Sequence, residues 1–432
     1  MNRKIIAVLA LIACIILIIA GFYVVYNPSS DKEEENDSNG NQQNNGDDPS
    51  SNENEEPPET NAGPWPMYLF GPDHQSFTTE SGPETKDLLW SEATGGITYG
   101  SAIVAEGKVF IGGGDGMNAY YENNGTLAWR FETYEPVPGG YGISSTPAYS
   151  NGFVYFGGDG IYCLSPDDGT VEWFVDTPAQ NWGDGTPTVA NGNVYIGGSD
   201  RKLYSIDQYT GEVHWTFQTQ SSGQSNYGLY AAPAVANGYV YLSACDSNLY
   251  KIREIQSSEV AVAQNTFQMA FASYSAPVIV DDRVFVGCGY TDTNIVNRFY
   301  CLDESDLSLI WAFNPTAPSS FFSSAGYYNN RIYIGSLDGN LYCFDSDGNL
   351  PTIIDQYDLG STWSSPAITS ERMYIGSKEG YVYCFDLSTT QALSYLWQYD
   401  TSGNVDSTPA ISGGRLYIGS HGNGGSVFCL GS

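Results

Sequence analysis

Aromatic and acidic residues recur at one offset in this sequence, three positions before a Pro or Ala that returns every 40 to 48 residues. Aromatic rings beside carboxylates suit a ligand with apolar faces and polar edges, such as a sugar or a peptide. Bulky side chains that merely fill the hole of a ring are the alternative, and the residue types leave both interpretations open. The eight candidate ligand-binding positions are Tyr99, Ser144, Asp184, Tyr230, Tyr274, Phe322, Trp363 and Asp406.

The cysteines have spacings that favour packing over chemistry. Five of them share one position of a repeat, too far apart for disulfides, and are predicted to be small buried hydrophobes: Cys163, Cys301, Cys343, Cys384 and Cys429. Cys245 and Cys288 end corresponding strands of adjacent repeats and are the one pair worth testing for a disulfide, which an oxidising exterior would permit. No Cys or His spacing indicates zinc, so we expect no metal site.

Other motifs that resemble active sites coincide with turns. The run from Asp345 to Asn349 resembles the start of a calcium loop but lacks the later acidic ligand. The run from Gly112 to Gly116 resembles a phosphate cradle but fits a hairpin. Acids that return from repeat to repeat favour turn shaping over catalysis, and these are Asp115, Asp159, Asp200, Asp246 and Asp338. We assign no catalytic residues.

These residues must be positioned by a repeat that occurs eight times between Ser101 and Leu430. Each copy predicts four short antiparallel strands, because apolar and β-branched residues alternate between Gly- and Asp-rich turns. The third copy is complete, with Thr186-Pro187, Val194 to Gly198, Asp200, Leu203 to Asp207, Thr210-Gly211 and Trp215. This period predicts an all-β, eight-bladed β-propeller. Its landmarks are Ala102, Pro147, Pro187, Pro233, Pro277, Ala325, Pro366 and Pro409.

The last copy ends at Leu430 after its third strand. Leu88-Leu89-Trp90 reads like a fourth strand with no first three before it. We therefore predict that this N-terminal strand completes the last blade and leaves no open edge in the ring. Removing it should destabilise the propeller.

The phrase Asp-x-x-Thr-Gly-x-x-x-Trp resembles the repeat of the pyrroloquinoline-quinone (PQQ) propeller family, and Asp207, Thr210, Gly211 and Trp215 match every position. Trp65-Pro66-Met67, followed by Gly71, Asp73 and Phe77, is similar to the opening segment of its short, non-enzymatic members, such as the propeller lipoprotein of outer-membrane barrel assembly. The resemblance implies that tryptophans dock neighbouring blades. The corresponding residues are Trp90, Trp129, Trp173, Trp215, Trp311 and Trp397.

The resemblance does not extend to the quinone cofactor. The dehydrogenases of the family carry adjacent cysteines over the quinone, whereas this chain has no Cys-Cys pair. They are also longer, with insertions that build the site. We expect no cofactor, and keep as the alternative a quinoprotein-like oxidoreductase with PQQ and calcium at the central channel.

The N-terminus predicts a membrane anchor and a spacer. Arg3 and Lys4 precede 22 apolar residues, Ile5 to Tyr26, which as a helix would span roughly 33 Å. The charges around this run place the N-terminus in the cytoplasm and the remainder outside. A lipobox that would lipidate Cys14 is the alternative. Residues 1–28 are thus a signal anchor, residues 29–62 a disordered acidic Asn-rich linker, and residues 63–432 the propeller.

The net charge of −33 excludes nucleic acid as a partner, because an acidic surface repels phosphate. Asn36 and Asn124 fit the glycosylation pattern. The sequence favours a membrane-tethered, extracytoplasmic, non-catalytic module that binds or scaffolds a protein, peptide or glycan. Cell-surface adhesion through glycans is a further alternative.

Overall fold

The computed structural model describes residues 65–431 apart from 115, 136–141, 179–184, 221–227, 256–259, 290–296, 316–318 and 389–392. The chain divides into two units, Met1–Glu56 and Pro57–Ser432, and every described residue belongs to the second. Among those residues no helix has the length and apolarity needed to cross a bilayer. The predicted anchor, linker, Cys14 and Asn36 lie outside them.

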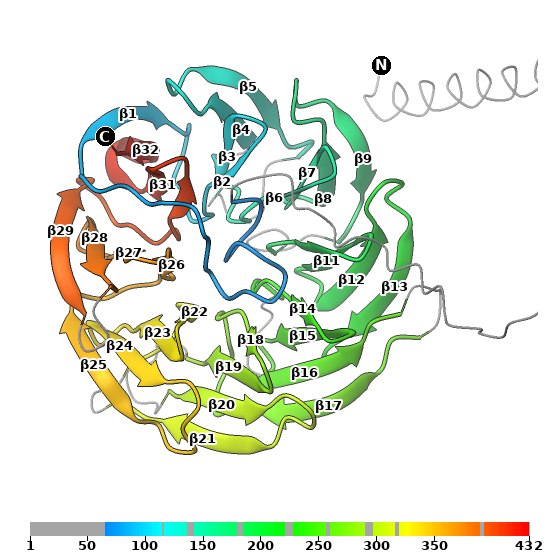
Figure 1. The fold of residues 1–432 in the computed structure, drawn as a ribbon. Helices are drawn as coiled ribbons and strands as arrows, with labels where there is room; N and C mark the ends of the chain where they lie inside the picture. Colours follow the sequence, from blue (N-terminus) through cyan, green and yellow to red (C-terminus); the bar gives the residue numbers. More distant parts are fainter. Residues whose placement is uncertain are drawn as a thin grey trace, which may run out of the picture. The chain divides into compact units, whose positions relative to one another are not determined.

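Eight four-stranded antiparallel sheets surround a central channel, as predicted (Figure 1). A short 3-10 turn, η1 (Gly422–Gly424), lies in the last blade. In ring order, with the innermost strand of each blade first, the sheets are β2 (Ile103–Ala105), β3 (Lys108–Gly113), β4 (Gly116–Tyr121) and β5 (Leu127–Glu132) in blade 1; β6 (Ala148–Ser150), β7 (Phe153–Gly157), β8 (Ile161–Leu164) and β9 (Val171–Val175) in blade 2; β10 (Thr188–Ala190), β11 (Asn193–Gly197), β12 (Lys202–Asp207) and β13 (Val213–Gln218) in blade 3; β14 (Ala234–Ala236), β15 (Tyr239–Ser243), β16 (Asn248–Arg253) and β17 (Ala263–Gln268) in blade 4; β18 (Val278–Val280), β19 (Arg283–Gly287), β20 (Phe299–Asp303) and β21 (Leu309–Phe313) in blade 5; β22 (Gly326–Tyr328), β23 (Arg331–Gly335), β24 (Asn340–Asp345) and β25 (Ile353–Asp358) in blade 6; β26 (Ala367–Ile368), β27 (Arg372–Gly376), β28 (Tyr381–Asp386) and β29 (Ser394–Asp400) in blade 7; and β30 (Ala410–Ser412), β31 (Arg415–Ser420), β32 (Ser426–Leu430) and β1 (Leu88–Ala93) in blade 8.

The first two strands of each blade are joined by a two-residue turn. Both turn residues have positive φ, as in Asn191-Gly192 with 51° and 78°. This geometry matches the twist of a tight hairpin and explains the recurrence of Asn-Gly there. The recurring aspartates shape the next turn, since Asp200 accepts hydrogen bonds from the Lys202 N–H and the Tyr204 hydroxyl. The turn-shaping interpretation of these acids is therefore correct for the described ones.

The ring closes through its first described strand. β1 pairs antiparallel with β32, with Trp90 opposite Cys429 and Glu92 opposite Val427. The last blade thus consists of β30, β31, β32 and β1, in that order from the channel outward. The predicted closure is confirmed.

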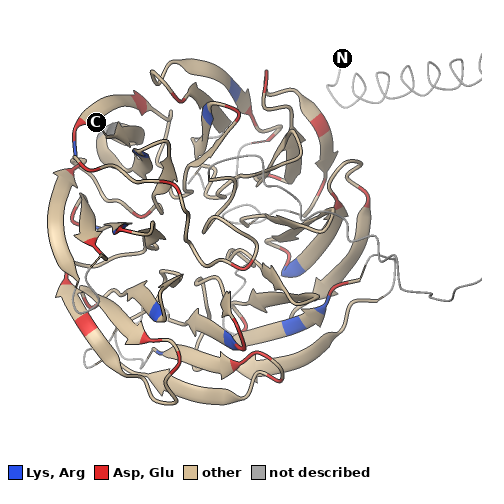
Figure 2. Cartoon of the chain, viewed as in Figure 1, with Lys and Arg blue, Asp and Glu red and all other residues tan. Residues whose placement is uncertain are grey.

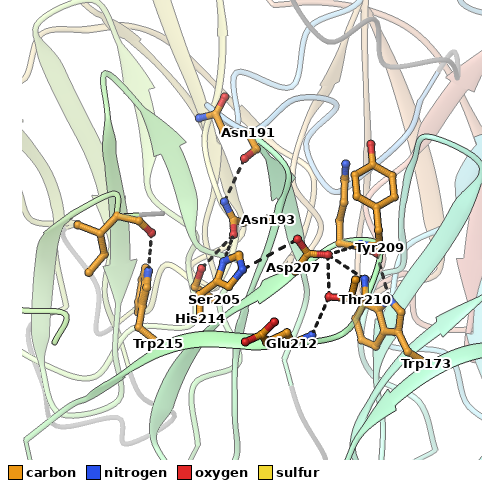
Figure 3. Close-up of polar contacts among 12 residues, drawn as sticks. Trp173, Asn191, Asn193, Ser205, Asp207, Tyr209, Thr210, Glu212, His214 and Trp215 are labelled. Atoms are coloured by element: carbon orange, nitrogen blue, oxygen red, sulfur yellow. Dashed lines mark hydrogen bonds and ion pairs between the residues drawn. The ribbon is translucent and has the colours of Figure 1, made fainter. Parts of the chain in front are cut away.

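The motif of the third blade shows how neighbouring blades dock (Figure 3). The Asp207 carboxylate accepts hydrogen bonds from the backbone N–H groups of Tyr209 and Thr210 and so fixes the turn. Gly211 leaves room for the preceding blade, because a Cβ there would lie 2.9 Å from the ring of Trp173. Trp215 in turn donates to the Ile255 carbonyl of the next blade. Each residue of the motif therefore serves a blade contact.

All six predicted docking tryptophans make this contact. Each indole N–H donates to a backbone carbonyl of the following blade at 2.9–3.1 Å, and the acceptors are Glu122, Pro166, Gln208, Ile255, Gly348 and Glu84. The strand position opposite the indole holds a small residue, such as Cys163 opposite Trp173. The shared cysteine position thus provides space for the indole.

In the two blades without this tryptophan, a charged side chain replaces the contact. Lys251 of blade 4 is buried and donates to the Glu304 carboxylate at 2.8 Å and the Glu304 carbonyl at 2.7 Å in blade 5. Asp355 of blade 6 accepts from the Leu393 N–H of blade 7. Sequence reasoning missed both residues.

All seven described cysteines are free and buried, and burial raises the pKa of the Cys245 thiol to about 12. The disulfide considered between Cys245 and Cys288 is not formed.

Residues Trp65–Ser81, here called the closing segment, run across one end of the channel before β1 begins (Figure 1). Six of its carbonyls accept the N–H of the second residue of an innermost strand at 2.7–3.0 Å, in blades 1, 2, 4, 5, 6 and 7. His74 Nε2 contacts Thr188 of blade 3 at 3.2 Å, and the Ser81 carbonyl accepts from Gly414 of blade 8. The segment therefore joins all eight blades and pairs backbone groups that would otherwise face the channel unsatisfied.

Candidate functional site

The loops that lead from each outermost strand to the next innermost strand gather at the other end of the channel. Seven of the eight predicted binding positions line one cavity of about 310 Å³ there, each from a different blade. The eighth, Asp184, and the nearby Tyr141, Trp182 and Tyr227 lie outside the described residues. Phe321, which sequence reasoning placed near the mouth, is fully buried against Phe299 instead. The seven lining residues are Tyr99, Ser144, Tyr230, Tyr274, Phe322, Trp363 and Asp406.

The closing segment forms the floor of this cavity. Tyr68 lines it, and its hydroxyl lies 3.2 Å from Ser324 Oγ and 2.9 Å from Ser365 Oγ. The cavity thus has a mouth at one end and ends at Tyr68 at the other.

A belt of hydroxyl groups surrounds the cavity just above Tyr68. The residue before each landmark Pro or Ala donates its N–H to the hydroxyl of the corresponding residue in the next blade, in six of eight links at 2.7–3.1 Å. The belt is interrupted where Ala232 and Ala276 supply no hydroxyl. The sequence carried a signal for it, since this residue is Ser or Thr in the other six copies. The belt residues are Ser101, Thr146, Thr186, Ser324, Ser365 and Thr408.

Aromatic rings form a continuous arc on one side of the mouth. Tyr230 stacks on Tyr274 with ring centroids 6.1 Å apart, and Tyr274 stacks on Phe322 at 5.0 Å. Phe322 stacks on Trp363 at 5.1 Å, and Tyr99 lies 6.5 Å from Trp363 at a tilt of 32°. The arc spans blades 4 to 7 and reaches blade 1, so one wall of the cavity is aromatic and the opposite wall carries hydroxyls.

A buried carboxylate lies at the end of the arc. The Asp406 side chain is 2% exposed, and its Oδ1 lies 3.3 Å from Lys378 Nζ. The Lys378 ammonium also lies 3.6 Å from the centroid of the Trp363 ring, the geometry of a cation–π contact. Sequence reasoning missed Lys378 because it comes from a hairpin turn, between β27 and β28, that has no special composition.

His421 completes this cluster as a neutral group. Its Nε2 lies 3.5 Å from Asp406 Oδ2, and its ring packs edge-on against Tyr99 at 4.6 Å. Burial lowers the pKa of His421 below its ordinary value, and Lys378 lowers it further, while Asp406 acts in the opposite direction. Lys378 is therefore the charge that balances Asp406 at neutral pH.

One polar group of the cavity has no partner. The Trp363 Nε1 atom is buried and has no hydrogen bond within the described part of the chain. A buried unpaired N–H is uncommon in proteins. It offers a donor to an acceptor that enters the cavity.

The residues do not fit a quinone site with calcium. Such a site requires a set of carboxylate and amide oxygens around the ion. Within the described ranges, no three His, Cys, Asp or Glu residues come together, and Asp406 is already paired with Lys378. No two cysteines are adjacent in the sequence.

Charge and modification sites lie away from the cavity. Acidic residues are spread over the blades and outnumber Lys and Arg (Figure 2). Asn124 lies in an exposed turn, where its Oδ1 accepts from the Thr126 N–H and hydroxyl.

The family model described as "Outer membrane protein assembly factor BamB" matches residues 115–291 and 270–431. The crystal structure of BamB from Moraxella catarrhalis is similar, at 13% identity and a TM-score of 0.60 over 81% of this chain and 98% of that one. The quinohemoprotein alcohol dehydrogenase from Comamonas testosteroni is similar at 12% identity and a TM-score of 0.65, over 86% and 82%. The computationally designed Ika8 protein has 12% identity and a TM-score of 0.62, over 80% and 99%. No curated protein matches the sequence.

Proposed function

The chain belongs to the family of BamB-like PQQ-repeat β-propellers, and from this premise we propose that it is a non-catalytic binding module. The observation that supports the proposal is the cavity, to which seven blades each contribute a different side chain. Positions that differ between copies of a repeat are free to serve recognition, because the repeated positions already provide the packing.

The shape of the cavity limits what can enter. Its volume of about 310 Å³ is at the lower end of the range for ligand pockets, about 300–1,000 Å³. Because it ends at Tyr68, it accepts the end or a projecting side group of a partner, and a chain cannot thread through it. A protein, peptide or glycan would enter between the aromatic arc and the hydroxyl belt.

The module would act outside the cell membrane. Residues 1–28 would anchor it, and residues 29–62 would hold the propeller away from the bilayer. Mass spectrometry of the N-terminal peptide of the purified protein tests this. An unmodified N-terminal segment supports the anchor, whereas a lipidated Cys14 at the new N-terminus replaces it with a lipoprotein.

Catalysis is not part of the proposal, because Asp406 is the one carboxylate among the described residues that line the cavity, and it is paired with Lys378. A dye-linked dehydrogenase assay after addition of PQQ and calcium provides the test. Turnover would revive the oxidoreductase alternative.

Binding is tested with arrays of peptides and glycans, probed with the full-length chain. We expect a subset to bind, and the double variant Trp363→Ala/Tyr274→Ala to lose this binding at least about tenfold, because it removes two rings of the arc. Tyr209→Ala is the matched control, since it removes an exposed ring from a turn outside the cavity.

Thermal melts separate binding from packing. Lost binding with a nearly unchanged melting temperature supports the proposal. A lower melting temperature with no array binding by the unaltered chain would mean that the rings only fill the channel. Binding to glycans alone would favour cell-surface adhesion.

A further inference from the structure

We propose that the mouth of the channel binds an organic ammonium group, and that Lys378 occupies this site in the free protein. The proposal rests on the binding function proposed above and specifies its ligand. Its basis is the joint placement of Lys378, Trp363 and Asp406 at one end of the aromatic arc.

The position of the Lys378 ammonium is a cation site by its own geometry. The Nζ atom lies 3.6 Å from the Trp363 ring centroid and 3.3 Å from Asp406 Oδ1. An aromatic face attracts a cation through its quadrupole, and a carboxylate beside it adds charge attraction. Phe322 and Tyr99 flank Trp363, so further rings border the same place.

The carboxylate is fixed and the cation can move. Asp406 is 2% exposed, whereas the Lys378 side chain is 27% exposed on a flexible four-carbon stem at the mouth. A buried carboxylate left without a partner is strongly destabilising. A ligand ammonium can take the place of Lys378 without leaving Asp406 unpaired, because Lys378 can extend into water.

Two further features favour a cation. His421 is neutral, so no second positive charge of the cluster opposes an incoming ammonium. The net charge of −33 attracts cations toward the protein and repels anions. The unpaired Trp363 N–H suits a ligand that carries an oxygen acceptor near its ammonium group.

The test measures ligand affinity by calorimetry with the full-length chain. Choline is the first probe, and 3,3-dimethylbutan-1-ol, its neutral counterpart of the same shape, is the control. We expect choline to bind at least about tenfold more tightly, since cation–π attraction and the carboxylate act only on the charged probe. Nα-acetyl-lysine amide and glucosamine test the two natural sources, a protein lysine and an amino sugar.

Two variants of the site have opposite expected effects. Asp406→Asn should weaken choline binding about tenfold or more, because the carboxylate is lost. Lys378→Met should strengthen it, because the competing ammonium is removed, and choline should raise the lowered melting temperature of this variant. Lys202→Met is the matched control, since it removes a lysine paired with Asp200 at 3.1 Å outside the cavity.

Equal binding of choline and its neutral counterpart, or weaker choline binding by Lys378→Met, would overturn the proposal. The array experiment separates this failure from failure of the binding function. A neutral array ligand that requires Trp363, without any ammonium binding, leaves the module intact and removes the ammonium assignment. No binding of either kind to the cavity would remove both.

Discussion

The two ends of the central channel are built in opposite ways. At the closed end, one segment of the chain joins all eight blades, mostly through backbone carbonyls that meet the innermost strands. At the open end, seven blades each contribute their own side chain to a cavity, and a tryptophan N–H there has no partner. The closed end satisfies its polar groups, and the open end leaves groups available.

This difference shows that stability and recognition occupy separate parts of one channel. Backbone hydrogen bonds at the closed end depend little on side-chain type. The side chains of the open end can vary because the packing beneath them is already complete. Changes at the closed end should therefore affect folding first, and changes at the open end should affect binding first.

The largest effect should follow from removing the closed end. A chain that starts at Pro83 keeps β1 but loses the buried Trp65, Met67 and Leu69, and we expect it to lose at least about 5 kcal/mol of unfolding free energy. A chain that starts at Gly95 also loses β1 and should lose more. Chemical denaturation measures both. A Gly95 chain that melts no earlier than the full-length chain would contradict the comparison and the closure of the ring.

The closed end should also be sensitive to acid through His74. Burial lowers the pKa of His74 to about 4 from its ordinary value near 6.5. Between these values the unfolded chain binds a proton that the folded chain excludes, so stability falls as pH falls, by about 1.4 kcal/mol per pH unit. The stability is fully present above pH 6.5.

His74→Gln should remove this slope, which denaturation at several pH values between 6.5 and 4 measures. Burial raises the pKa of the neighbouring Asp73, so that group acts in the opposite direction. The difference between the two proteins cancels its effect. An unchanged slope in the variant would mean that His74 does not make the closed end acid-sensitive.

The hydroxyl belt lies between the two ends and should have an intermediate effect. Ser365→Ala removes the acceptor of the Ser324 N–H, 2.8 Å away, and leaves a buried donor unpaired. We expect a loss of about 1–3 kcal/mol in unfolding free energy. Ala232→Ser, which adds a hydroxyl at a gap of the belt, should not destabilise the protein. A neutral result for Ser365→Ala would show that the belt is not needed for packing.

The smallest effect on stability should come from the open end. Phe322→Ala removes two stacking contacts from a partly exposed ring, and we expect a loss of about 1 kcal/mol. Trp173→Ala, which removes a ring of 8% exposure between blades, should cost about 3–5 kcal/mol. Similar losses in the two variants would erase the distinction between recognition and packing.

The sequence predicted the parts of the fold that repeat. Each docking tryptophan, shared cysteine position and turn aspartate recurs at one period, so eight weak signals reinforce one another. The mouth positions could be predicted as well, because a fixed offset from a landmark residue corresponds to a fixed place in each blade. Lys251 and Asp355 escaped notice because they replace a tryptophan with a different kind of contact.

The closing segment could not be predicted from its residues in the same way. It occurs once, and its carbonyls carry no side-chain signature. Leu69, Phe70, His74 and Ser76 adopt positive φ, a conformation that residue type alone does not indicate for them. The cluster of Lys378, Asp406 and His421 was missed because its members come from separate loops of two blades, which meet only after the ring has closed.

The pairing of β1 with β32 imposes an order of events on synthesis. Thr85 and Gly431 are hydrogen bonded although they are 346 positions apart in the chain. A growing chain therefore exposes the edge of β1 throughout translation, and its partner strand is among the last segments to be made. Contacts of such sequence separation slow folding and leave an unpaired edge open to wrong partners. Whatever guards that edge during synthesis determines how much of this protein matures.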